Sequence, residues 1–295
     1  MIQVTFWGTR GSLPTPDPET TRFGGNSSCV EVQGGDGTVL ILDAGTGILR
    51  LGRKLAVGTG RIDILLTHLH LDHIQGLGFF APIYQPGREV HVWGPPSTTQ
   101  ALPERLARYL SPPLFPVYLR DVPSRLHIHD LTGDDIHIGR FHIAVAFVCH
   151  PNPTVGFRIT DGESILTYLP DHEPALGTGT LDRAPEWISG YALAEGADLL
   201  IHDAQYSDEE YPAHIGWGHS SMRQALAFAG LSSVAMLVPF HHDPSHSDDD
   251  VDRIVGEAVR EVNPPFTVVA AMEGSGFVLD EGRIQLRQQA TSHPT

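Results

Sequence analysis

The hexapeptide His68-Leu69-His70-Leu71-Asp72-His73 places four potential metal ligands within six residues, directly after the apolar run 62–67. In an extended backbone, residues two apart point to the same side, so His68 and His70 can hold one metal ion. Where the chain then turns toward a helix, Asp72 and His73 can face a second ion. Buried histidines without a ligand would need other polar partners. The spacing therefore predicts two adjacent metal sites at the end of a strand.

Composition narrows the class of protein. The 295 residues are 41% hydrophobic and 18% charged, which is typical of a globular chain with a full core. The formal net charge of −16 argues against a general affinity for long nucleic acids, because that affinity depends on rows of Lys and Arg. Cys29 and Cys149 form no CxxC pair, and we find neither a secretory signal nor an apolar run of membrane-spanning length. We expect a cytoplasmic protein with no membrane partner.

Short Val/Ile/Leu runs between many Gly and Pro residues predict numerous strands and a few helices. The predicted strands are 2–7, 28–33, 38–43, 62–67, 89–93, 125–129, 135–138, 141–147, 154–160, 164–169, 199–203, 234–239, 267–270 and 276–279. The predicted helices are 45–55, 98–109, 183–194, 221–229 and 248–262, the last with an acidic first turn that complements its dipole. We expect an α+β fold in which two mixed sheets pack face to face with helices outside. Residues 1–287 are expected to form one domain, and 288–295 a frayed tail.

The hexapeptide, together with downstream segments, resembles the metallo-β-lactamase superfamily, from Gly8-Thr9-Arg10-Gly11-Ser12 to His241. The resemblance implies the four-layer αββα sandwich of that fold. It also implies that His68, His70 and a third histidine bind one metal, that Asp72, His73 and a last histidine bind the other, and that an aspartate bridges the two.

Three later segments supply the remaining ligands that the resemblance implies. His150 ends the apolar run 141–149 and is the third histidine, and Asp171 follows the run 165–170 as the bridging carboxylate. His241 is preferred as the last histidine because it is the first after its strand, while His242 competes with it. His242 or His246 could instead support the ligands from behind. Asp43 is interpreted either as a carboxylate that orients ligands or as a helix N-cap.

The ligand set predicts hydrolysis. Two divalent ions, zinc first and manganese or iron as alternatives, would turn a bridging water into hydroxide. Asp72 is expected to be a catalytic residue as well as a ligand. Segments 199–205 and 218–221 resemble the ribonuclease Z and cyclic phosphodiesterase branch, which implies that Asp203 orients His219 and that His219 protonates the leaving alcoholate. That branch often carries glutamate at the first position, so the shorter Asp203 is a departure.

The expected substrate is a small cyclic or terminal phosphodiester. Ribonuclease Z reaches its tRNA with a long basic arm between the third histidine and the bridging aspartate, but here residues 151–170 hold only a turn and two strands. Arg10 and Asn26 are predicted substrate contacts, with a surface salt bridge and ordinary turn chemistry as the respective alternatives. Trp217 and Tyr206 flank the proposed His219 relay and could stack on a base. A homodimer is expected from the resemblance.

Two other hypotheses about the function are consistent with the sequence. The same metal site could hydrolyse a thioester or a lactone, in which case His219 is structural. A non-catalytic, metal-stabilised binding module is the third reading, although structural zinc sites are closed and use four ligands whereas seven are present here.

Overall fold

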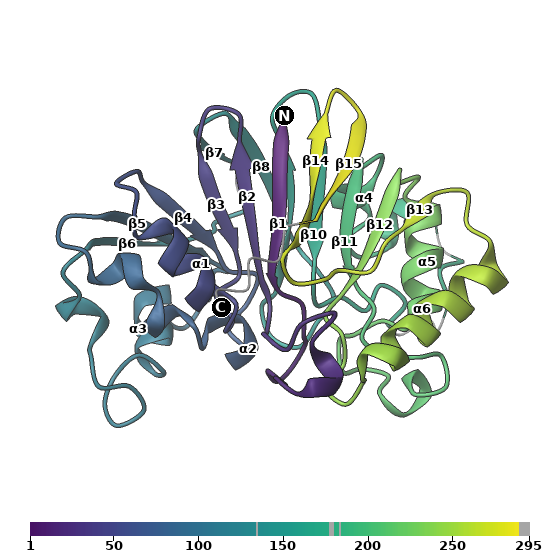
Figure 1. Cartoon of the computed structure of the whole chain (residues 1–295), viewed down its shortest axis with the longest axis horizontal. Coiled ribbons are helices and arrows are strands. Elements are labelled where there is room, and N and C mark those ends of the chain that lie inside the picture. Colours follow the sequence, from purple (N-terminus) through teal and green to yellow (C-terminus); the bar gives the residue numbers. More distant parts are fainter. Residues whose placement is uncertain (134, 177–179, 183, 289–295) are drawn as a thin grey trace.

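A computed structural model describes residues 1–133, 135–176, 180–182 and 184–288 as two β-sheets between two groups of helices (Figure 1). The first sheet has the strand order β15-β14-β1-β2-β3-β4-β5-β6, and the second has the order β13-β12-β11-β10-β9-β8-β7. Both sheets are mixed, since β3 to β6 and β10 to β13 run parallel while their neighbours pair antiparallel. The α+β prediction of two mixed sheets with outer helices is confirmed.

Most strand bounds follow the predicted ranges closely, whereas the helix predicted over 98–109 is shorter. The strands of the first sheet are β1 (Ile2–Gly8), β2 (Cys29–Gly34), β3 (Val39–Leu42), β4 (Ile62–Leu65), β5 (Glu89–Gly94), β6 (Arg125–Asp130), β14 (Ser275–Asp280) and β15 (Arg283–Gln288). The strands of the second sheet are β7 (Ile136–Ile138), β8 (Phe141–Phe147), β9 (Val155–Thr160), β10 (Ile165–Leu169), β11 (Leu199–Asp203), β12 (Met236–Phe240) and β13 (Thr267–Val268). The helices are α1 (Ile48–Leu55), α2 (Leu71–Ile74), α3 (Leu102–Ala107), α4 (Tyr191–Ala194), α5 (Met222–Leu231) and α6 (Asp248–Val262).

Three apolar clusters join the four layers. One lies between the sheets and includes Phe6, Phe157 and Phe240. A second packs α1 and α3 against the first sheet, and a third packs α4, α5 and α6 against the second. In Figure 1 the two helix groups accordingly lie on opposite sides of the paired sheets. Alternation along each strand decides this arrangement, because successive side chains enter different clusters.

The helix predicted over 183–194 is wrong for most of its length. The structure has a 3-10 turn at Pro185–Trp187 and a short α4 that begins only after Gly190. Gly190 has φ of +75°, a left-handed conformation that interrupts helical backbone. The apolar spacing that suggested one helix therefore belongs to two separate turns.

The C-terminal strand β15 was not predicted. Only Ile284 and Leu286 alternate with polar residues in it, yet it pairs antiparallel with β14 over its whole length. The predicted tail begins at residue 288, the last residue of β15, and residues 289–295 lie outside the described part of the chain. The single domain over 1–287 stays a prediction.

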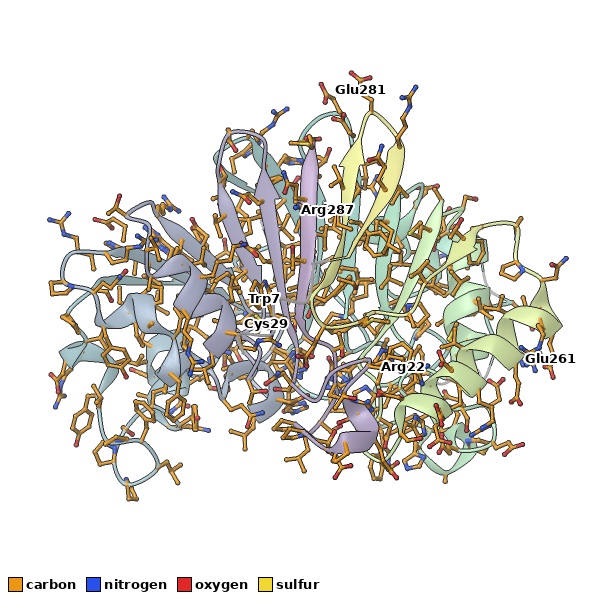
Figure 2. The ribbon with its side chains drawn as sticks, in the orientation of Figure 1. Trp7, Arg22, Cys29, Glu261, Glu281 and Arg287 are labelled. Carbon is orange, nitrogen blue, oxygen red and sulfur yellow. The ribbon has the colours of Figure 1, made fainter. Side chains whose placement is uncertain are left out.

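The acidic start of α6 does more than complement the helix dipole. Ser247 caps the helix together with Asp250, whereas the buried Asp248 accepts hydrogen bonds from the backbone N–H groups of Arg22 and Phe23. The Arg22 side chain, which Figure 2 labels, pairs with Asp249 and Asp252 at the surface. Among the described residues, no helix is long and apolar enough to cross a membrane.

Candidate metal centre

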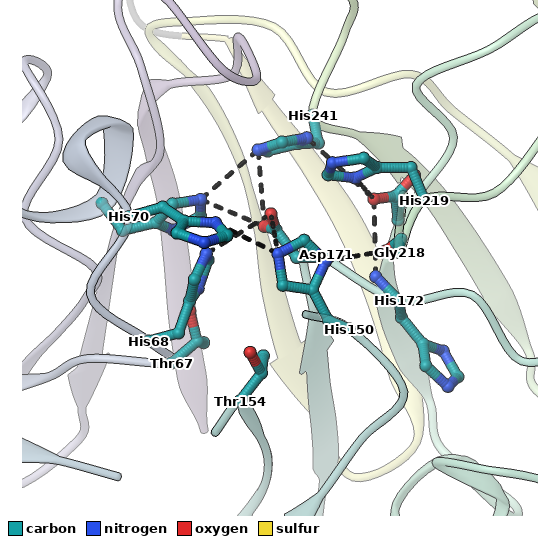
Figure 3. A network of polar contacts seen from close by, with 12 residues as sticks. Thr67, His68, His70, His150, Thr154, Asp171, His172, Gly218, His219 and His241 are labelled. Atoms are coloured by element: carbon teal, nitrogen blue, oxygen red, sulfur yellow. Dashed lines mark hydrogen bonds and ion pairs between the residues drawn. The ribbon is translucent and has the colours of Figure 1, made fainter. Parts of the chain in front are cut away.

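The predicted ligands lie where strands of both sheets end. His68 and His70 follow β4, Asp72 and His73 lie in α2, His150 follows β8, Asp171 follows β10, and His241 follows β12. Carboxyl ends of parallel strands meet at one edge of a sheet, and the two sheets bring these edges together. Figure 3 shows His70, His150, His219 and His241 arranged around Asp171.

His68, His70, His150 and Asp171 form the first group, and their ligand atoms all lie within 4.8 Å of one another. His70 Nδ1 is 3.2 Å from His150 Nε2. Asp171 Oδ2 lies 3.7 Å from His68 Nε2 and 3.6 Å from His150 Nε2. The buried Nε2 of His68 has no hydrogen-bond partner among the described residues. An unpaired buried nitrogen is costly, and a metal ion in this group would satisfy it.

Asp72, His73 and His241 form the second group. Asp72 Oδ2 lies 3.2 Å from Nε2 of each of the two histidines, and these two nitrogens are 3.3 Å apart. Asp171 reaches this group with its other oxygen, since Oδ1 is 3.0 Å from His73 Nε2 and 3.4 Å from His241 Nε2. Asp171 therefore presents one carboxylate oxygen to each group, which is the arrangement that a bridging ligand requires.

Burial and neighbouring charges set the ionisation of the ligands. Burial lowers the pKa of His68 and, despite the charge of Asp171, brings the pKa of His150 to about 4, so both rings keep free lone pairs at neutral pH. For Asp171, burial would raise the pKa, but the charges of His241, His73 and His68 hold it well below its usual range. Neutral imidazole and ionised carboxylate are the forms that bind metal.

His73 differs from the other ligands. Burial alone would lower its pKa, but the charges of Asp171, Asp72 and Asp43 together raise it well above the usual value. A positive charge is thus favoured at His73 Nε2, between the carboxylates. A divalent cation bound there would replace that proton.

Asp43 supports the second group from behind. Its Oδ2 accepts from His73 Nδ1 at 2.8 Å and from the Tyr168 hydroxyl at 3.0 Å, while its Oδ1 accepts from the Thr67 N–H. The bond to Nδ1 fixes the tautomer that leaves His73 Nε2 free for a metal. The alternative interpretation of Asp43 as a helix N-cap is wrong, because Gly47 occupies that position of α1.

His219 and Asp203 are paired beside the metal ligands. His219 Nδ1 lies 2.6 Å from Asp203 Oδ2, and Asp203 Oδ1 accepts from the Ser220 and Gln205 N–H groups. Burial would lower the pKa of His219, but the charge and hydrogen bond of Asp203 raise it to about 9. The ring stacks on His241, with centroids 5.1 Å apart. The shorter aspartate side chain therefore reaches the histidine.

Two residues of the site were missed by the sequence analysis. Gln205 Oε1 accepts from His241 Nδ1 at 3.0 Å and so orients that ring. The fully buried Glu173 accepts from the N–H groups of Gly216 and Gly218 and from the Tyr211 hydroxyl, and so anchors the loop that leads to His219. Both positions carried a signal, since Gln205 lies two residues after Asp203 and Glu173 two residues after Asp171.

The two predicted substrate contacts are engaged elsewhere. Arg10 is fully buried, and its guanidinium donates to the carbonyls of Gly24, Asp243 and His246. Arg10 therefore connects the loop at Gly24 to the loop at 243–246, and its side chain is not accessible to a substrate. Asn26 is half-buried and donates from its backbone and side chain to Glu273. The geometry gives Asn26 a structural function, and its contact with a substrate stays a prediction.

The competing histidines and the flanking aromatics are also placed. His242 Nε2 lies 2.9 Å from the Ala271 carbonyl and His246 Nε2 2.9 Å from Glu210 Oε1, so neither joins the two metal groups. Tyr206 is buried under His214, with ring centroids 4.2 Å apart, and is not available for stacking on a base. Trp217 is 60% exposed on the loop before His219.

Comparison with known proteins agrees with this geometry. Residues 38–242 match the family described as "Beta-lactamase superfamily domain". The chain belongs to the metallo-β-lactamase superfamily. It is 30% identical over 268 residues to a ribonuclease Z from Mycolicibacterium gilvum, and the match covers 83% of this chain and 85% of the relative.

Solved structures of low sequence identity share the metallo-β-lactamase fold. The YhfI protein of Bacillus subtilis superposes with a TM-score of 0.69 at 20% identity, covering 95% of this chain and 100% of the other. Zn²⁺-bound PqqB from Methylobacterium extorquens gives 0.64 at 18% identity, again covering 95% and 100%. The four-layer fold implied by the resemblance is confirmed.

Membership of the superfamily establishes the general activity. The superfamily, which includes ribonuclease Z homologues, consists of metal-dependent hydrolases. Proteins of this fold bind divalent metals, typically zinc, and the described histidines and aspartates form groups that fit them. This metallo-β-lactamase-superfamily chain is therefore a metal-dependent hydrolase.

Proposed function

We propose that the protein is a phosphodiesterase that hydrolyses small cyclic or terminal phosphodiesters, such as cyclic nucleotides. The observation that carries the proposal is the buried His219–Asp203 pair, whose imidazole stacks on the metal-ligand candidate His241. A thioester releases a thiolate, which leaves without a proton, whereas a diester of an aliphatic alcohol releases an alkoxide, which benefits from a general acid. A protonated histidine at this place matches the needs of an alkoxide leaving group.

The metal groups and the acid have separate functions in this proposal. His68, His70 and His150 would hold one divalent ion, Asp72, His73 and His241 the other, and Asp171 would contact both. Two such ions, with zinc expected and manganese or iron as alternatives, supply a nucleophile at neutral pH and stabilise charge on the phosphoryl oxygens. Asp203 keeps His219 protonated and oriented, and His219 donates its proton to the leaving oxygen.

The surroundings of the site support a small substrate. His70 lines a cavity of about 420 Å³, together with Leu71, Tyr109, Asn152, Arg105 and Arg108. Its volume is in the range of small-molecule sites. The net charge of −16 opposes contact with a long nucleic acid. We include in the proposal a small phosphodiester as partner and a homodimeric assembly.

The deciding experiment compares two leaving groups in one enzyme. Wild-type protein loaded with zinc or manganese is assayed on a 2′,3′-cyclic nucleotide and on bis(p-nitrophenyl) phosphate, whose p-nitrophenolate leaves at neutral pH without protonation. We expect His219→Ala to lower kcat on the cyclic nucleotide by about 10²–10⁴-fold and to affect the aryl diester much less. His214→Ala, on the same loop, is the matched control and should leave both rates near wild type.

Either of two results would overturn the proposal. One is hydrolysis of a thioester or lactone by the metal-loaded protein while both diesters stay intact. The other is an equal loss on both diesters in His219→Ala, because a structural residue would not distinguish the leaving groups.

A further inference from the structure

A separate group of potential metal ligands lies on strands β5 and β6, at the edge of the first sheet and apart from the two groups of the metal centre. Glu89, His91 and His127 bring one carboxylate oxygen and two imidazole nitrogens within 4.8 Å of one another. Figure 1 shows these two strands at the left end of the molecule. None of the three residues takes part in the hydrolytic site.

The parallel pairing of the strands creates the group. His91 lies directly opposite His127 in the register, and Glu89 is two residues earlier on the same face of β5. Val90 and Val92 alternate with these residues and point into the apolar cluster beneath the helices. Glu89 and His91 therefore lie on the opposite face of β5, the face that packs between the two sheets nearer the centre of the molecule. At the sheet edge it is uncovered: the side chains of Glu89 and His127 are 37% and 47% exposed.

The three ligand atoms lie close together. Glu89 Oε2 is 3.1 Å from His127 Nε2 and 4.0 Å from His91 Nε2. The two imidazole rings stack with centroids 4.5 Å apart, which places their nitrogens side by side. Two imidazoles and one carboxylate form a donor set used by zinc, and the exposed side leaves room for water as a further ligand.

His129 and Trp93 hold the ring of His91 in place. His91 Nδ1 shares a hydrogen bond of 2.9 Å with His129 Nε2, and His129 in turn stacks on Trp93 with centroids 4.0 Å apart. With the proton on His91 Nδ1, its Nε2 offers a lone pair toward Glu89 and His127. Metal-binding histidines ordinarily donate their other ring N–H to such a partner. Burial also lowers the pKa of His91 and of His129, which keeps both rings neutral at physiological pH.

One cation competes for the site. Arg125 Nη1 donates to Glu89 Oε1 at 3.0 Å, and its side chain is 70% exposed. This bond occupies the oxygen that faces away from the histidines and keeps the carboxylate ionised. Exposed ion pairs of this kind contribute little free energy, so Arg125 can yield or share the carboxylate when a metal binds.

We infer that Glu89, His91 and His127 form a surface site for one divalent transition metal ion of the zinc class, separate from the hydrolytic centre. A metal bound there links the edge strand β6 to β5 and stabilises the folded chain by mass action. The inference does not rest on the proposed function, because it concerns other residues and is read out by binding.

The test is zinc binding by the full chain after its metal has been stripped. Bound zinc per chain is measured by equilibrium dialysis and elemental analysis for the wild type, for the double variant H91A/H127A and for the control H142A/H214A, which loses two histidines from other surfaces. We expect H91A/H127A to bind about one zinc fewer than the wild type and the control to bind as much as the wild type. The rate of diester hydrolysis or of any other turnover is not needed for this readout.

A second variant keeps the test decisive if the double variant folds poorly. Arg125→Gln removes the competing cation and leaves every ligand in place, so it should bind zinc at this site more tightly than the wild type. Equal zinc content in the wild type and H91A/H127A, an equal loss in the control, or weaker binding by Arg125→Gln would each overturn the inference.

Discussion

His219 Nδ1 and Asp203 Oδ2 lie 2.6 Å apart in a pocket that is almost closed to solvent, at the junction between β11 and the loop before α5. The two side chains come from segments that are sixteen residues apart in the sequence. Their contact turns an ordinary histidine into one that stays protonated at neutral pH. The pair therefore places a proton donor next to the metal ligands.

The pH profile of phosphodiester hydrolysis should report this pair. The pKa of His219 is raised to about 9, so the acid form is fully present at neutral pH and is lost as the pH rises through about 9. We expect kcat on a cyclic nucleotide to fall above that pH. In Asp203→Asn the carboxylate charge is gone, and the falling limb should move to lower pH. A limb that stays in place in Asp203→Asn would show that His219 is not the group titrating.

Asp43 should control metal affinity without touching the metal. Its Oδ2 accepts the proton of His73 Nδ1, and Asp43→Asn would weaken that bond and loosen the ring. We expect about a 10–100-fold loss of zinc affinity, measured by competition with a chromophoric chelator. Tyr168→Phe removes a neutral donor from the same oxygen and is the matched control, with a much smaller expected loss. Equal effects of the two changes would contradict an orienting function for the carboxylate.

Gly11 should be required for the position of His241. A Cβ added at Gly11 would overlap the imidazole ring of His241, whereas one added at Gly60 would meet no atom within 4 Å. Gly11→Ala should therefore displace His241 and lower kcat by about 10²-fold, since small misplacements at an active site have effects of that size. Gly60→Ala should match the wild type. The measurement is kcat together with bound metal per chain; unchanged values in Gly11→Ala would refute the steric argument.

Glu173 should stabilise the loop that carries His219. Its buried carboxylate accepts from Gly216, Gly218 and Tyr211, and Glu173→Gln replaces one accepting oxygen by an amide that faces N–H donors. We expect the free energy of unfolding to fall by about 1–3 kcal/mol in urea denaturation. Glu257→Gln, at an exposed pair with Arg253 on α6, should change it by less than about 0.5 kcal/mol. A Glu173→Gln variant as stable as the Glu257→Gln control would contradict the anchoring function.

The sequence by itself determined the layers of the fold and the two ligand clusters. Short apolar runs specify strands, alternating with polar residues where one face is buried and continuous where both are. His68 to His73 are close in space because they are close in the chain. The resemblance to the metallo-β-lactamase superfamily implied His150, Asp171 and His241 as the remaining ligands, and each of them follows a strand of the structure. The wrong helix over 183–194 shows the limit of periodicity, since the extended Ile188 and the left-handed Gly190 separate a 3-10 turn from α4.

Only the tertiary structure decided what the side chains contact. Arg10 looks like an anion contact in the sequence, but the packing of three loops buries it completely. Two adjacent histidines, His241 and His242, differ only in direction, and the backbone turn at His241, with φ of +62°, sends one ring to the metal groups and the other to the Ala271 carbonyl. Glu173 and Gln205 lie close in the sequence to predicted site residues, but their functions depend on contacts with the distant Gly216, Gly218 and His241, which only the folded chain brings together. The Glu89–His91–His127 group likewise forms only when β5 pairs with β6.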